Sequence, residues 1–183
     1  RQRIVRQKSE LPRQTLRVLW VGRMLSLKRV DTLLKAVACC RAKFSISLTL
    51  VGDGPLRGKL EKLAKKMFGA RLEGVRFEHS VSIGAVRELM RSHDVYVLPS
   101  NGYEGWGAVV SEALEEGMTV FGTHEAGSCA TILPDSQLFH VGDWRRLARL
   151  LEMFYLEPQK FDNGGSFLWT AARAAERLLS CEL

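Results

Sequence analysis

Residues 94–116, DVYVLPSNGYEGWGAVVSEALEE, contain the pattern that decides the fold. The four apolar residues Val95–Leu98 are typical of a short buried strand. A glycine-rich loop over residues 99–107 follows, and residues 107–116 are predicted to be helical. A strand that leads through such a loop into a helix is the repeating part of a βαβ unit.

The same alternation of strand and helix extends along the rest of the chain. Further strands are predicted at residues 16–21, 47–51, 75–77, 119–121 and 138–141. Further helices are predicted from Asp31 to about Phe44, and over residues 56–67, 86–90, 144–156 and 166–179. Short strands alternating with helices indicate an α/β fold, a Rossmann-like parallel sheet with helices on both faces.

Right-handed crossovers place the carboxyl ends of all parallel strands along one edge of such a sheet. Ligands of open α/β sheets bind in the crevice at that edge. The loops predicted to lie there are residues 22–28, 52–55, 78–82, 99–107 and 122–131.

The length of 183 residues suits one domain, which we expect at residues 16–183 after a lead-in or linker at 1–15. Because the chain starts at Arg1 without a methionine, we expect a fragment of a longer protein. The net charge is +7 and is uneven: residues 1–45 carry twelve Lys and Arg against two acids, and the remainder carries fifteen against eighteen. The basic part suits a phosphorylated small ligand, an anionic membrane or a nucleic acid, or it is a solvated face.

The four cysteines and four histidines lack the spacing of a metal site or a disulfide framework. We therefore expect reduced thiols in a cytosolic protein and no bound metal. No signal peptide and no apolar run long enough to span a membrane are present.

The loop after the first predicted strand places two cations near the sheet edge, just before a helix. Arg23 and Lys28 follow Gly22 in this loop. Arginine grips a phosphate with two parallel hydrogen bonds, lysine adds a compact charge, and a helix start adds free N–H groups. The alternative is that both side chains are simply solvated.

Glu104 and Glu112 lie eight positions apart, one in the glycine-rich loop and one about a turn into the following helix. Gly105 and Gly107 allow the backbone to approach a ligand closely. Carboxylates here are suited to accept hydrogen bonds from sugar hydroxyls, so that one glutamate would bind a ribose and the other a hexose. A glutamate near a helix start is equally explained by the helix dipole.

The N–H groups of Gly107, Ala108 and Val109 lie at the predicted helix start. Unpaired N–H groups at such a position bind phosphate. These three residues therefore join the candidate binding residues.

The segment from Glu104 to Ala113 resembles the E-x(7)-E signature of retaining GT-B glycosyltransferases, specifically glycosyltransferase family 4. Four other segments resemble the family in order and spacing, so that the likeness covers about residues 16–156. They are Val21-Gly22-Arg23 with Lys28, residues 51–55, residues 94–100, and Gly142-Asp143 before a helix.

The resemblance implies a role for each candidate residue. Arg23 and Lys28 bind the phosphates of a nucleotide-sugar donor, Glu104 is the catalytic residue beside the donor sugar, and Glu112 binds the ribose. The remaining donor-binding residues are Gly22, Gly105, Trp106, Gly107, Ala108 and Val109. Retention of anomeric configuration, a UDP- or GDP-linked sugar as substrate, and no cofactor or essential metal are also implied.

The resemblance further implies a two-domain protein whose N-terminal acceptor domain is absent here, so that this chain binds donor but transfers no sugar by itself. The acceptor is a glycan or lipid, and the full-length protein is cytoplasmic, with peripheral association at the inner face of the membrane. No nucleic-acid partner is expected, because aromatic residues are not interleaved with the basic ones.

Two positions depart from the family pattern after the fifth strand, where paired glycines and a glutamate are typical. Ala126 and Ala130 stand there instead, which leaves the sugar undetermined. His79 also stands where a glycine is common near the base pocket. A non-catalytic nucleotide-sugar-binding or interaction module stays open. A GT-B relative that is not a transferase, such as a nucleotide-sugar epimerase, is disfavoured because such relatives lack the loop with Glu104 and Glu112. An oxidoreductase is disfavoured because no G-x-G-x-x-G follows the first strand.

Overall fold

The computed structural model describes residues 14–161, apart from the side chains of residues 70 and 71. Its centre is a six-stranded sheet in the order β3-β2-β1-β4-β5-β6, and every pair of neighbours is parallel. The strands are β1 (Leu16–Val21), β2 (Ile46–Val51), β3 (Val75–Glu78), β4 (Val95–Leu98), β5 (Thr119–Thr123) and β6 (Leu138–Phe139). The predicted Rossmann-like α/β fold is therefore confirmed.

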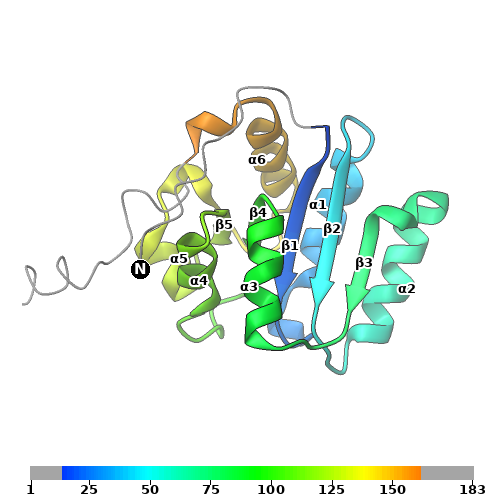
Figure 1. Cartoon of the computed structure of the whole chain (residues 1–183), viewed down its shortest axis with the longest axis horizontal. Coiled ribbons are helices and arrows are strands. Elements are labelled where there is room, and N and C mark those ends of the chain that lie inside the picture. Colours follow the sequence, from blue (N-terminus) through cyan, green and yellow to red (C-terminus); the bar gives the residue numbers. More distant parts are fainter. Residues whose placement is uncertain (1–13, 162–183) are drawn as a thin grey trace, which may run out of the picture.

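Helices cover both faces of the sheet, as Figure 1 shows. They are α1 (Val30–Cys40), α2 (Arg57–Phe68), α3 (Ile83–Ser92), α4 (Val109–Glu115), α5 (Gly127–Ile132) and α6 (Trp144–Leu156). Helix α1 packs against α2 and α6 on one face, whereas α4 packs against α3 and α5 on the other. Short 3-10 helices lie at Ser26–Lys28, Gly69–Gly74, Asp135–Gln137 and Pro158–Lys160.

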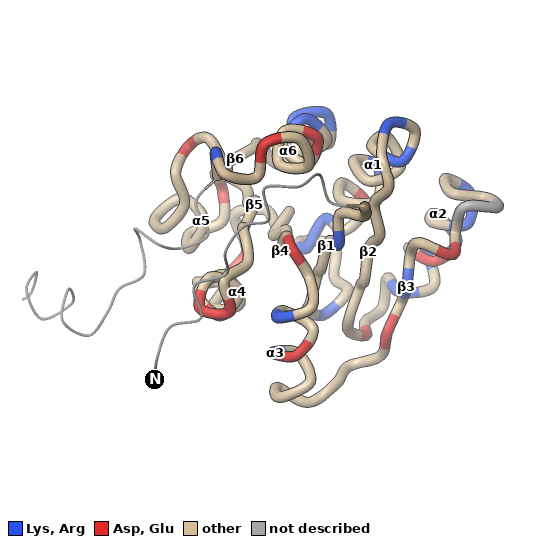
Figure 2. Tube along the Cα trace, turned by 45° about the horizontal axis from the view of Figure 1, so that its top comes forward, with Lys and Arg blue, Asp and Glu red and all other residues tan. Residues whose placement is uncertain are grey.

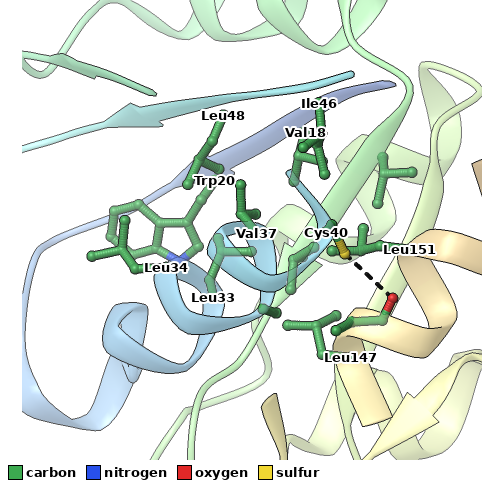
Figure 3. Packing of buried hydrophobic residues seen from close by; sticks show 14 of the residues in the cluster. Val18, Trp20, Leu33, Leu34, Val37, Cys40, Ile46, Leu48, Leu147 and Leu151 are labelled. Atoms are coloured by element: carbon green, nitrogen blue, oxygen red, sulfur yellow. Dashed lines mark hydrogen bonds between the residues drawn. The ribbon is translucent and has the colours of Figure 1, made fainter. Parts of the chain in front are cut away.

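Apolar side chains from β1, β2, α1 and α6 fill the larger core (Figure 3). Trp20 of β1 and Leu34 of α1 are fully buried there. The apolar run Val18–Val21 that follows the exposed Arg17 agrees with a strand covered on both faces, which needs no polar alternation. Cys40 belongs to this core, and its thiol donates to the carbonyl oxygen of Ala148 at 3.4 Å. Burial raises the pKa of Cys40 to about 12, so this thiol stays protonated.

Two predicted segments are wrong. The helix expected to reach about Phe44 ends at Cys40, after which a turn leads into β2. Residues 122–131 were expected to form one loop, but Gly122 and Thr123 complete β5, and α5 begins at Gly127. Helix α5 has six residues and so is too short to produce a recognisable helical period.

The other boundaries differ by small amounts. Helix α4 begins at Val109, so Gly107 and Ala108 belong to the loop, and Gly107 has a φ of 68° that favours glycine. Strand β6 has two residues in place of the four predicted. The predicted helix at 166–179 and most of the lead-in at 1–15 lie outside the described residues.

The far end of α4 is fixed by a buried carboxylate. Glu116 is 5% exposed and accepts from Arg91 of α3 at 2.7 and 3.3 Å and from Arg87 at 3.4 Å. The two arginines are partly exposed, but they are the donors to a buried carboxylate, so these contacts hold α3 and α4 together. This contact fixes the helix that carries Glu112.

Candidate functional site

A pocket of about 380 Å³ lies at the carboxyl edge of the sheet. It is an open pocket lined by the end of β1, the end of the loop after β1, the start of α3, the loop after β4 and the start of α4. The residues that line it are Val21, Gly22, Lys28, Ile83, Val86, Glu104, Gly107, Ala108, Val109 and Glu112. The pocket lies at the edge where the sequence predicts a crevice, and it brings together seven of the ten candidate residues.

The loop after β1 is built on the backbone of the loop after β2. The N–H of Met24 donates to the carbonyl of Asp53 at 2.8 Å, and the carbonyl of Met24 accepts from Leu56 at 3.2 Å. Gly52 has a φ of 131°, and a Cβ atom at this position would overlap the carbonyl oxygen of Gly22. Only glycine allows the two chains to approach so closely, which fixes Gly22 at the pocket.

Lys28 is placed by a short 3-10 helix, Ser26–Lys28, that immediately precedes α1. Arg29, which follows it, has a left-handed backbone with φ of 45° and is the one non-glycine residue with positive φ among those described. The N–H of Asn101 donates to the carbonyl of Leu27 at 2.9 Å and so joins this loop to the loop after β4. The junction explains why Lys28 and Glu104, 76 positions apart, lie side by side.

Lys28 and Glu104 form a close ion pair inside the pocket. The Nζ atom of Lys28 lies 2.6 and 2.5 Å from the two carboxylate oxygens of Glu104. The two side chains are only 18% and 9% exposed. The cation predicted to bind phosphate is thus already paired with the carboxylate predicted to lie beside the sugar.

Glu112 differs from Glu104 in having no partner. It is half-buried and lines the same pocket, yet its carboxylate makes no hydrogen bond or ion pair with any residue in the described part of the chain. Both oxygens are therefore available as acceptors for a ligand hydroxyl. Figure 2 shows that acidic residues, and no basic ones, mark α4.

The start of α4 presents backbone donors to the pocket. The N–H of Val110 donates to the carbonyl of Gly107 at 3.0 Å. Those of Gly107, Ala108 and Val109 make no backbone hydrogen bond within residues 14–161. All three residues line the pocket, so these N–H groups are positioned where the sequence places an anion.

The three remaining candidates do not line this pocket. Arg23 is exposed, so the two predicted cations are separated, with Lys28 inside the pocket and Arg23 outside it. Gly105 has no atom within 4 Å of the position that a Cβ would take, and Trp106 is 56% exposed. Both belong to a stretch of the loop that projects into solvent.

Sequence reasoning missed one wall of the pocket and a buried tyrosine that is hydrogen-bonded to a lining residue. The wall is apolar and comes from Ile83 and Val86 of α3. The buried hydroxyl of Tyr96 donates to the carbonyl of the lining residue Val21 at 3.1 Å and fixes the end of β1. Burial raises the pKa of Tyr96, and the charges of Glu104 and Glu112 raise it further. The one indication of this contact in the sequence is the tyrosine in the otherwise aliphatic strand β4.

The loops after β2 and β3 are joined beside the pocket by Asp53. Its carboxylate accepts from the N–H of Ser80 at 2.9 Å and lies 2.7 Å from Nδ1 of His79. The hydrogen bond from Ser80, followed by that of His79, lowers the pKa of Asp53 to about 2. His79, which stands where the family commonly has a glycine, therefore takes part in this junction of the two loops.

The two alanine departures lie away from the pocket lining. Ala126 is fully buried, packs in the core beside α5, and precedes the first residue of that helix. Ala130 is exposed on α5. Among the described residues no group of three or more His, Cys, Asp or Glu is arranged to hold a metal ion, and no helix is long and apolar enough to cross a membrane.

Comparisons with known proteins agree on one family, the glycosyltransferases. Residues 1–164 match the family model described as glycosyl transferases group 1. A phosphatidyl-myo-inositol mannosyltransferase of Mycobacterium tuberculosis is 30% identical over 135 residues, which are 71% of this chain and 33% of that protein. The chain thus spans about a third of the length of this relative.

Solved structures agree with this family. The catalytic domain of cholesterol-alpha-glucosyltransferase from Helicobacter pylori has a TM-score of 0.67 at 26% identity, covering 79% of this chain and 88% of that one. Anabaena Alr3699/HepE, solved in complex with UDP, has a TM-score of 0.73 at 20% identity, covering 93% and 50%. The second likeness concerns the fold alone. With the family model matched over most of its length, the chain belongs to the group 1 glycosyl transferases.

Proposed function

We propose that this domain binds the nucleotide-sugar donor of a retaining glycosyltransferase of family 4. The observation that carries the proposal is that one pocket, at the ligand-binding edge of the sheet, contains Lys28, Glu104 and Glu112 in a chain of the group 1 family. Lys28 belongs to the loop after β1, whereas Glu104 belongs to the loop after β4 and Glu112 to α4, far away in the sequence. The UDP in Alr3699/HepE, whose fold is similar, supports a nucleotide diphosphate as the ligand class.

In the proposed complex the diphosphate lies between Lys28 and the N–H groups of Gly107, Ala108 and Val109. Arg23 reaches it from the rim, since its exposed side chain has no ion-pair partner among the described residues. The ribose hydroxyls donate to Glu112, which is the carboxylate without a partner. The apolar wall formed by Ile83 and Val86 accommodates the nucleoside.

The remaining glycine-rich loop completes the proposed donor site. Glu104 lies beside the donor sugar as the catalytic residue, Gly22 and Gly105 allow close backbone approach, and Trp106 covers the ligand from the exposed side. The leaving diphosphate is stabilised by the two cations and the backbone donors, so that the reaction needs no metal. Anomeric configuration is retained, as in the family that the sequence resembles.

The wider setting is proposed from the resemblance. The full-length protein has a second, N-terminal domain that holds a glycan or lipid acceptor, and residues 16–183 alone bind donor without transferring sugar. The protein is cytoplasmic and associates with the inner face of the membrane. Cell fractionation of the full-length protein tests this location, and recovery outside the cytoplasm and membrane fractions would contradict it.

Titration calorimetry with UDP, GDP and ADP tests the proposed donor site. One of the three is expected to bind, and Glu112→Ala should weaken it by about 1–3 kcal/mol, the usual contribution of a hydrogen bond to a charged group. Arg23→Ala should weaken the diphosphate far more than the corresponding nucleoside. Equal losses for both ligands would remove Arg23 from the phosphate site.

A protein-interaction module would bind none of the three nucleotides, and that outcome would refute the proposal. Transfer of sugar to any acceptor by the isolated chain would refute the requirement for a second domain. Glu115→Ala, which removes an exposed carboxylate from the same helix outside the pocket, is the matched control for Glu112→Ala and should leave binding unchanged.

A further inference from the structure

The charges inside the pocket do not suit a diphosphate as they stand. Its ionisable lining consists of one cation, Lys28, and two carboxylates, Glu104 and Glu112. The cation is engaged by both oxygens of Glu104 at 2.6 and 2.5 Å, and both side chains are mostly buried. A diphosphate therefore meets a net negative pocket lining whose single lysine is already paired with a carboxylate.

We infer that Glu104 holds the place on Lys28 that a phosphate of the ligand takes when the ligand binds. This exchange of Glu104 for phosphate makes the site select a nucleotide sugar over the bare nucleotide diphosphate. The inference rests on the proposed function and concerns the same site. When a donor enters, Lys28 transfers its hydrogen bonds from Glu104 to a phosphate oxygen. The released carboxylate of Glu104 then accepts from the hydroxyls of the sugar.

A bare nucleotide diphosphate completes only the first half of this exchange. It takes Lys28 from Glu104 but offers the freed carboxylate no hydroxyl, so a largely buried charge is left unpaired beside the phosphates. An uncompensated buried charge is costly, and its repulsion by a nearby anion adds to that cost. The sugar thus determines whether the exchange is favourable, and a product that has lost its sugar is bound less tightly.

Glu112 provides the internal comparison, because it lies in the same pocket without a partner. Glu104→Gln and Glu112→Gln each remove one negative charge from the pocket, but only the first frees Lys28. A general effect of charge would strengthen diphosphate binding in both variants. The exchange predicts a gain in Glu104→Gln alone.

Calorimetry of the 183-residue chain tests the inference with UDP, GDP, ADP and inorganic pyrophosphate, and with UDP-glucose, GDP-mannose and ADP-glucose. Glu104→Gln should bind the bare diphosphate about tenfold more tightly than the unsubstituted chain, the factor expected for about 1.4 kcal/mol. It should bind the corresponding nucleotide sugar no more tightly. The preference for the sugar-bearing ligand should therefore disappear.

A double-mutant cycle separates this role from a purely structural one. In a Lys28→Met background, Glu104→Gln should no longer increase diphosphate affinity, because there is no ammonium to release. Thermal unfolding of each variant confirms that the compared chains are folded. Glu104→Ala, which also removes the carboxylate and should show the same gain in diphosphate affinity, serves as the second variant if Glu104→Gln does not fold.

The possible results distinguish the inference from the function on which it rests. If the unsubstituted chain binds a nucleotide and Glu104→Gln binds the bare diphosphate no better, the exchange is refuted while the donor site stands. Equal gains in Glu104→Gln and Glu112→Gln also refute it, in favour of a general charge effect. If no variant binds any of the probes, the proposed function itself is refuted.

Discussion

The carboxyl edge of the sheet has two halves that are built differently. The loops after β1, β2 and β3 are joined by their own backbones: Gly22 donates to Val51, Met24 to Asp53 and Gly52 to Glu78, at 2.8–3.1 Å. The loop after β4 is connected to them through Asn101, and beyond that residue Tyr103 and Trp106 are 86% and 56% exposed.

The difference separates two tasks within one site. The closed half, made by the first three loops, fixes the position of Gly22 and the course of the chain to Lys28. The open half, made by the loop after β4, carries Glu104, Gly105 and Trp106, the side chains and backbone proposed to meet the sugar. Substitutions in the closed half should therefore cost stability, and those in the open half should chiefly change binding.

The largest effect is expected from Gly52→Ala in the closed half. Alanine must adopt a φ of 131°, and its Cβ would overlap the carbonyl oxygen of Gly22. Strain and overlap together should reduce the free energy of unfolding by about 3 kcal/mol or more. Urea unfolding followed by circular dichroism measures this, and a loss below about 1 kcal/mol would show that the two loops separate easily.

A smaller effect is expected from Arg57→Met, which removes the side chain that joins the loops after β2 and β3. The guanidinium of Arg57 donates to the carbonyls of Gly52 and Glu78 at 2.9 Å and of Phe77 at 3.1 Å. Methionine keeps the apolar stem but leaves these acceptors without that donor. A loss of about 2 kcal/mol is expected in the same unfolding experiment.

Arg76→Met is the matched control for Arg57→Met. Arg76 is an exposed arginine on β3 for which the described residues provide no hydrogen-bond or ion-pair partner. Its replacement should change the free energy of unfolding by less than about 0.5 kcal/mol. Equal losses for the two variants would mean that the hydrogen bonds of Arg57 contribute little to holding the closed half together.

The closed half was the more predictable part of the fold. Strand β1 and the turn from Gly52 to Pro55 are evident in the sequence because apolar runs and glycines determine local geometry. Helix α5 was not predicted, since six residues give no period, and Gly122 was assigned to a loop although it belongs to β5. At this position tertiary packing decides the structure: a Cβ on Gly122 would overlap Cys129.

The candidate site was predictable in its residues but not in its contacts. Spacing placed Lys28 and Glu104 near one edge, but gave no reason to expect that they pair with each other, because the pairing depends on the junction of Asn101 with Leu27. The exposure of Arg23 depends likewise on how the loop turns after Gly22. The apolar wall from α3 was missed because Ile83 and Val86 are common helix residues without a distinguishing pattern.

No loss of stability is expected from Gly105→Ala, the same substitution as Gly52→Ala placed in the open half. No atom lies within 4 Å of the position that the new Cβ would take, and Gly105 is not among the described glycines with positive φ. Alanine also restricts the unfolded chain, so the free energy of unfolding should stay the same or rise by about 0.4–1 kcal/mol.

The second measurement on Gly105→Ala is its affinity for the nucleotide sugar. If the backbone at Gly105 approaches the sugar closely as proposed, the added methyl group lies between backbone and ligand, and affinity for the nucleotide sugar falls although stability does not. Gly52→Ala should instead lower stability and affinity together. A loss of stability in Gly105→Ala as large as that in Gly52→Ala would show that the loop after β4 is packed like the first three, and the distinction between the two halves would no longer hold.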